Sequence, residues 1–248
     1  MSFQNCRTGL ELLPYFFEIY SMDTSAIKRK AYVGLLQLLL ILGLVLFLCA
    51  GTLCFWQAWV YLALFGGSSL LVTIYLMKKD LALLQRRLNA GPAGEKTTTQ
   101  IVIQAFASVS FLAIMAVPGF DQRYDWSQVP LYLTLVGDAV VVTGFYCVFK
   151  VFKENTYTSA VIETAENQQV ISTGPYSLVR HPMYSGALLM LLFTPLALDS
   201  YWTLLFFMPI FVTIVFRLLD EEKFLSVNLP GYVDYCRKVR YRLIPGLW

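Results

Sequence analysis

Long apolar stretches are the feature that most constrains this chain. Four of them approach or exceed the roughly 20 residues that a helix needs to cross a ~30 Å hydrocarbon layer. Only 14% of the residues are charged, whereas soluble domains carry about 25%. This pattern predicts an integral membrane protein that crosses the bilayer several times. The four long stretches are Val33–Phe55, Trp56–Met77, Gln100–Gly119 and Val129–Phe149.

Two shorter apolar stretches follow, Met183–Leu198 and Tyr201–Phe216, with only Asp199 and Ser200 between them. Each contains one proline. The short polar break predicts a tight helical hairpin, since a chain that leaves the bilayer so briefly turns straight back. The expected fold class is therefore all-α, a polytopic transmembrane helical bundle of about six spans with a C-terminal helical hairpin.

The basic residues test this arrangement, because Lys and Arg in short loops favour the cytoplasmic side of a membrane. Of the 19 Lys and Arg residues, all but Arg123 lie in the segments 1–32, 78–98, 150–182 and 217–248. Six spans would put these four segments on one face, so we expect both termini in the cytoplasm. The net charge of +3 favours membrane lipids as neighbours over nucleic acid. The cell membrane and the endoplasmic reticulum both remain open.

The chain divides into a cytoplasmic N-terminal segment (1–32), four spans (33–150) and a C-terminal region (151–248) that holds most of the informative polar residues. The aromatic run Leu10–Tyr20 is either an interfacial helix or a poorly ordered tail. The basic loop Lys78–Thr99 is expected to form an amphipathic helix at the membrane surface, without a chemical role.

Isolated polar residues add little by themselves. The five cysteines form no C-x-x-C pair, so the sequence indicates neither a disulfide framework nor a zinc site. Asp138 lies near the middle of the fourth span, where a charge costs about 2.5–3.5 kcal/mol on insertion scales. A buried structural aspartate is the favoured interpretation there, with a functional role as the alternative.

The polar segment from Lys153 to Tyr184 leaves the membrane and returns to it. Short strand-like pieces are expected at Tyr157–Ile162 and Gln169–Ser172, and a turn follows them. Pro182 disfavours helix at the preceding residue and suits the first turn of the next helix. The only histidine, His181, should therefore lie at the cytoplasmic mouth of the fifth span.

A second polar group stands at the cytoplasmic end of the last span. Arg217 and Glu221 are four residues apart and share a helix face, while Glu222 is rotated by about 100° from Glu221. Without other information, a solvated helix end with a surface ion pair is the favoured interpretation of these residues.

Two sequence blocks resemble those of the isoprenylcysteine carboxyl methyltransferases and phospholipid methyltransferases. The first has a G-P-Y-x-x-V-R-H-P-x-Y-x-G core at 174–186, and the second has an arginine, an acidic pair, G-Y-x-x-Y and a C-terminal proline between 217 and 245. With the hairpin between them, the match covers about 90 residues. Residues 1–150 resemble the family only as membrane spans.

The resemblance implies a membrane-embedded methyltransferase with a cytoplasmic pocket for S-adenosyl-L-methionine. Its methyl acceptor would be lipophilic and enter from the bilayer, as a prenylcysteine-type carboxylate or a related O, N or S nucleophile. No metal is implied, and the oligomeric state is open. The implied catalytic residues are Arg217, His181 and Glu221. The implied cofactor-binding residues are Gln169, Val170, Gly174, Tyr176, Arg180, His181, Pro182, Tyr184, Glu221 and Glu222.

Two other functions remain as alternatives. Some NADPH-dependent membrane sterol reductases share an R-H-P-x-Y block near their C-terminus. A non-enzymatic bundle that keeps the fold is the second alternative, since fold does not fix function.

Overall fold

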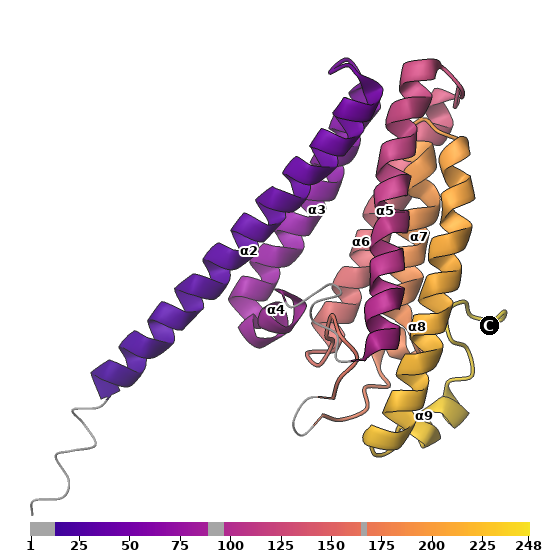
Figure 1. Cartoon of the computed structure of the whole chain (residues 1–248). Coiled ribbons are helices and arrows are strands. Elements are labelled where there is room, and N and C mark those ends of the chain that lie inside the picture. Colours follow the sequence, from indigo (N-terminus) through magenta and orange to yellow (C-terminus); the bar gives the residue numbers. More distant parts are fainter. Residues whose placement is uncertain (1–12, 89–96, 165–167) are drawn as a thin grey trace, which may run out of the picture.

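The structure is a computed structural model that describes residues 13–88, 97–164 and 168–248, with side chains from residue 24 onward. The described residues form helices joined by short loops and contain no strand (Figure 1). The elements are α2 (Leu13–Ala50), α3 (Trp56–Lys79), α4 (Leu81–Leu88), α5 (Thr98–Tyr124), α6 (Leu131–Glu154), η2 (Gly174–Ser177), α7 (Pro182–Ala197), η3 (Trp202–Phe206), α8 (Phe207–Asn228) and α9 (Tyr232–Lys238).

Five of these helical segments are long and apolar enough to cross a membrane. They are Thr24–Ala50, Trp56–Lys79, Thr98–Tyr124, Leu131–Glu154 and Trp202–Asn228. The shorter apolar helix α7 has 16 residues, which gives a length of about 24 Å at 1.5 Å per residue. Leucines along α2 are exposed, as expected for side chains that face lipid. The predicted all-helical, multi-pass membrane bundle is confirmed.

Small residues allow the central helices to approach closely. α6 and α7 pack together most extensively, and a Cβ atom at Gly137 would lie 2.6 Å from the backbone nitrogen of Ala197. α2 meets α5 in the same way, since a Cβ atom at Gly119 would lie 2.6 Å from the carbonyl oxygen of Leu46. From this contact α2 leans away from the other helices toward its N-terminal end (Figure 1).

A buried polar network joins the ends of the helices opposite α4 and α9. The Asp199 carboxylate, in the turn after α7, accepts hydrogen bonds from the Gln57 amide at 2.6 Å and the Val129 backbone N–H at 2.8 Å. Asp121 at the end of α5 accepts from the hydroxyls of Ser127 and Ser200. The hairpin predicted between the last two apolar stretches thus turns at residues whose polar atoms are paired.

The other end of the bundle carries the polar segments that were expected to hold the chemistry. The described residues 155–164 and 168–172 form turns and bends, so the predicted strand-like pieces are absent. No neighbouring strand lies there for them to pair with, and side chains hold the segment instead. The basic loop predicted to be helical contains α4, whose Leu83 and Leu84 are buried against Phe152 in the bundle, and residues 89–96 of that loop lie outside the described residues. Part of the expected interfacial run Leu10–Tyr20 lies outside the described residues, and none of its side chains is described.

Candidate functional site

A pocket opens at this end of the bundle, between the loop 155–171, the start of α7 and the end of α8. It contains about 860 Å³ of space between protein atoms, including its opening to solvent. Its lining combines tyrosines, two arginines, one histidine and two glutamates. The arrangement suits a ligand with both charged and apolar parts.

The start of α7 fixes one wall of the pocket. Pro182 is the first residue of the helix and His181 its N-cap, as the sequence predicted. The C-terminal segment lies alongside: the backbone N–H of Arg180 donates to the carbonyl of Tyr241 at 2.9 Å, and that of His181 donates to the carbonyl of Arg242 at 3.0 Å. This pairing fixes the segment before α7 against the C-terminal segment.

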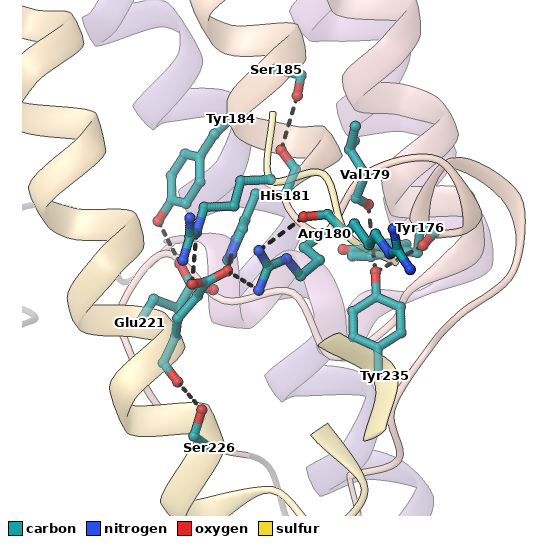
Figure 2. A network of polar contacts seen from close by, with 12 residues as sticks. Tyr176, Val179, Arg180, His181, Tyr184, Ser185, Glu221, Ser226 and Tyr235 are labelled. Atoms are coloured by element: carbon teal, nitrogen blue, oxygen red, sulfur yellow. Dashed lines mark hydrogen bonds and ion pairs between the residues drawn. The ribbon is translucent and has the colours of Figure 1, made fainter. Parts of the chain in front are cut away.

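Glu222 joins this wall to α8 from behind the pocket. Its side chain is buried and lies 2.9 Å from the Arg180 guanidinium, 2.9 Å from that of Arg242 and 3.3 Å from His181 Nε2 (Figure 2). Both carboxylate oxygens are therefore engaged by cationic or polar groups of the protein itself. The start of α7 thus has a carboxylate of the protein itself beside it, and Glu222 is not among the residues that line the pocket.

Glu221 lines the pocket from the neighbouring position on α8. Its carboxylate accepts a hydrogen bond from the Tyr184 hydroxyl at 2.7 Å, and that hydroxyl accepts one from Arg217 Nε at 3.2 Å. Arg217 also donates to the Gln100 side chain and to the carbonyl of Ala160, both at 2.9 Å. Arg217 is thereby anchored, while Glu221 presents a carboxylate that has one hydrogen-bond partner among the described residues.

Three tyrosines form the opposite wall. Tyr232 and Tyr235 come from α9, and Tyr176 from η2 packs against them. The Tyr235 hydroxyl donates to the carbonyl of Tyr176 at 2.8 Å, and Asn155 donates to the Tyr176 hydroxyl at 2.9 Å. Burial raises the pKa of both Tyr176 and Tyr235 above the usual range. Both phenols therefore stay neutral at physiological pH and act as polar aromatic surfaces.

Two buried polar atoms in the lining have no partner in the part of the chain that the structure describes. They are Arg180 Nε and the Tyr232 hydroxyl. Buried donors in proteins are nearly always hydrogen-bonded, so each such atom calls for an explanation. A ligand that supplies acceptor oxygens to this pocket would satisfy both atoms.

The structure brings together most of the residues predicted for the site. Eight of the ten predicted cofactor-binding residues line the pocket, and so do all three predicted catalytic residues. Gly174 and Glu222 do not line it. Gly174, the first residue of η2, has a φ of 55°, so a side chain there would be strained and would meet Glu154. The residues in the pocket are Gln169, Val170, Tyr176, Arg180, His181, Pro182, Tyr184, Arg217 and Glu221.

The prediction of site residues omitted the loop Tyr157–Glu163 and the tyrosines of α9, all of which contribute to the lining. The G-Y-x-x-Y spacing offered a signal for Tyr232 and Tyr235, because an offset of three places both rings on one helix face. No sequence pattern marks the loop residues. Their place in the lining depends on contacts with other elements.

Comparison with known proteins agrees with this geometry. Residues 132–229 match the sequence model of the phospholipid methyltransferase family. This match, the methyltransferase-family region, begins in α6 and ends just after α8, so it includes the start of α7, Arg217 and both glutamates. The family comprises integral membrane methyltransferases, in agreement with the helical bundle.

A second comparison concerns a relative with another activity. A stretch of 92 residues is 35% identical to the Delta(14)-sterol reductase of Mus musculus, which corresponds to 35% of this chain and 22% of that protein. The chain thus spans less than a quarter of the length of this relative.

Proposed function

We propose that this protein is an S-adenosyl-L-methionine-dependent methyltransferase that acts on a lipophilic acceptor. The observation that carries the proposal is the pocket lining, which includes Glu221, Arg180 and Tyr232. Arg180 Nε and the Tyr232 hydroxyl are buried and have no partner among the described residues. The family of residues 132–229 supplies the methyl-transfer chemistry.

The charges of the lining fit the amino-acid part of this cofactor, which carries an ammonium and a carboxylate. Glu221 suits the ammonium, because charge-assisted hydrogen bonds are the stronger ones. Arg180 suits the carboxylate with its remaining N–H, since Glu222 and the carbonyl of Arg240 already hold its other two nitrogens. In this arrangement Glu222 orients the arginine and does not bind the ligand.

The aromatic wall fits a cationic ligand. S-adenosyl-L-methionine, when bound, supplies a methyl group activated by a positively charged sulfonium. Tyrosine faces attract cations, and a nearby carboxylate adds to the attraction. Tyr176, Tyr232 and Tyr235, together with Glu221, provide both kinds of group in one cavity. Holding an acceptor in line with the methyl group would supply much of the acceleration.

The need for a base depends on the acceptor. A carboxylate is already a nucleophile and needs none, whereas an amine or a phenol must lose a proton. His181 Nε2 is held by Glu222, which leaves Nδ1 as the nitrogen of this ring that could take that proton. Glu221 is the other candidate base, through its own carboxylate or through the Tyr184 hydroxyl that it accepts from.

Access for the acceptor follows from the position of the pocket at the end of the bundle. We infer that this end is cytoplasmic, because it carries α4, α9 and most of the basic residues that the structure describes. A lipophilic acceptor would then reach the pocket from the cytoplasmic leaflet of the membrane. The cell membrane and the endoplasmic reticulum are both compatible with this orientation.

A sterol-type reductase that uses NADPH is the second candidate, and it rests on the likeness to Delta(14)-sterol reductase. NADPH carries several phosphate charges, which call for exposed cations or helix N-termini. In the described lining, Arg180 is paired with Glu222, and the carboxylates of Glu221 and Glu163 face the same space. This charge balance favours a cationic ligand over a polyanionic one.

Calorimetric titration of the detergent-purified protein tests the proposal. We expect saturable binding of S-adenosylhomocysteine, no binding of NADPH, and binding at least tenfold weaker in Glu221→Ala, since loss of a charged hydrogen bond is worth about 1.5–3 kcal/mol. Lys223→Ala, an exposed change two residues away on the same helix, is the matched control. Binding of NADPH with none of S-adenosylhomocysteine would replace the methyltransferase with the reductase.

A further inference from the structure

The pocket wall formed by residues 155–164 has no helix or strand of its own. Seven of its residues line the pocket, namely Asn155, Tyr157, Thr158, Ser159, Val161, Ile162 and Glu163. A segment without regular structure keeps one conformation only if other groups satisfy its backbone. The shape of the pocket therefore depends on what holds this wall.

Three arginines hold it by its carbonyl oxygens. Arg86 donates to the carbonyl of Thr156, Arg87 donates to that of Ser159 at 2.7 Å, and Arg217 donates to that of Ala160 at 2.9 Å. Arg217 belongs to α8 and lines the pocket. The other two come from α4, which lies before residue 132 and hence outside the methyltransferase-family region.

α4 is itself fixed to the bundle, so it acts as a rigid support. Asp80 accepts from the backbone N–H of Leu83 at 2.9 Å, in the first turn of α4, and its other carboxylate oxygen accepts from the Thr156 hydroxyl. Leu83 and Leu84 are buried in a cluster that includes Phe152, with Met183 packed against it. The helix therefore contacts the pocket wall at Thr156 and Ser159, and its buried leucines belong to a cluster against which Met183 of the pocket packs.

Arg87 is the central member of this support. Its guanidinium lies 5.4 Å from the centre of the Phe152 ring, in addition to its bond to Ser159. Burial lowers the pKa of Arg87 below its usual value, which agrees with a side chain held away from water. A basic side chain on a membrane-surface helix would otherwise turn toward lipid headgroups.

We propose that α4 positions the pocket wall 155–164, and that Arg87 is a positioning residue for cofactor binding. The inference rests on the proposed function for the identity of the ligand. The geometry of the wall is independent of that function. It assigns a functional role to the first two spans, α2 and α3, because α3 leads directly into α4. A substitution in α4 would then alter ligand affinity although it replaces no residue of the pocket lining.

The experiment combines hydrogen exchange and calorimetry on the full-length protein in detergent. In Arg87→Met, amide exchange in the peptide covering 155–164 should rise in the absence of ligand, and the affinity for S-adenosylhomocysteine should fall by about tenfold, as expected for loss of a charge-assisted hydrogen bond. Arg87→Lys keeps a cationic hydrogen-bond donor, so it should restore part of the protection from exchange and part of the ligand affinity. Lys79→Met removes a positive charge from an exposed residue at the end of α3, close to α4 in the chain. It should change neither the exchange rate nor the affinity.

Each outcome decides the inference. If amide exchange in 155–164 is unchanged in Arg87→Met, the inference is overturned. It is also overturned if exchange is faster in this variant while its affinity for S-adenosylhomocysteine equals that of the wild type. If the wild-type protein binds no S-adenosylhomocysteine, the proposed function fails, and the exchange rate alone decides whether α4 holds the wall. Should Arg87→Met not fold, Arg86→Met makes the same test at the more exposed of the two contacts.

Discussion

Two adjacent glutamates on α8 have different surroundings. Glu221 faces the pocket with one hydrogen bond, whereas Glu222 is buried among Arg180, His181 and Arg242. The difference arises from the rotation of about 100° between consecutive helical residues. It separates a group suited to binding a ligand from a group that holds the protein together.

This separation predicts opposite effects of the same substitution. Glu221→Gln should weaken binding of S-adenosylhomocysteine and leave the melting temperature nearly unchanged. Glu222→Gln should destabilise the protein by about 2 kcal/mol, because Arg180 and Arg242 lose their anionic partner. Thermal unfolding in detergent, measured beside ligand titration, distinguishes the two. A Glu222→Gln protein as stable as the wild type would contradict the structural role.

Asp199 gives a prediction about pH at the opposite end of the bundle. Burial raises the pKa of its carboxyl, so the folded protein binds this proton more tightly than the unfolded chain. The contribution of this residue to stability is therefore fully present below the unfolded pKa and is lost as the pH rises through the folded pKa. Nearby Asp121 and Asp125 act in the same direction.

Asp199→Asn should remove this dependence. Asparagine tolerates the positive φ of 58° at this position, and it can still hydrogen-bond to Gln57 after that amide turns over. We expect the variant to be at least as stable as the wild type at pH 7, with its advantage shrinking as the pH falls. Melting temperatures across pH 4–8 would check this, and a less stable variant at pH 7 would contradict it.

At the scale of elements, the contact between α6 and α7 holds the start of α7 in place. Gly137→Ala would bring a Cβ atom against the backbone of Ala197, and overpacking of this kind costs about 1–3 kcal/mol. We expect a lower melting temperature for this variant. Gly67→Ala is the control, because nothing lies within 4 Å of its added Cβ. Equal melting temperatures for the two variants would show that the helices separate at little cost.

The helices were predictable, but the segments between them were not. The apolar stretches and Pro182 located α3, α5, α6 and α7, because hydrophobicity and the missing proline N–H act locally. The strand-like pieces at 157–162 and 169–172 were wrong, since alternating residues form a strand only where a partner strand is available. The contacts from Arg86 and Arg87 could not be anticipated, because they join residues about 70 positions apart.

At the scale of the whole molecule, the native cysteines can test the orientation in the membrane. Cys54 is exposed between α2 and α3, and Cys236 lies in α9 at the pocket end. In sealed vesicles with the cytoplasmic face inside, and with Cys6 changed to serine, we expect an impermeant maleimide to label Cys54. Cys236 should react only after permeabilisation. The reverse pattern would place the pocket on the other side of the membrane.

The sequence by itself determined that the chain is a multi-pass helical membrane protein, and it located two polar blocks with family-like motifs. Both conclusions follow from local properties, namely the length of apolar stretches and the order of residues in a motif. Only the tertiary structure decided that Glu221 faces the pocket while Glu222 does not, and that α4 supports the pocket wall. These results depend on which faces of the helices meet, and that is set by packing between residues far apart in the chain.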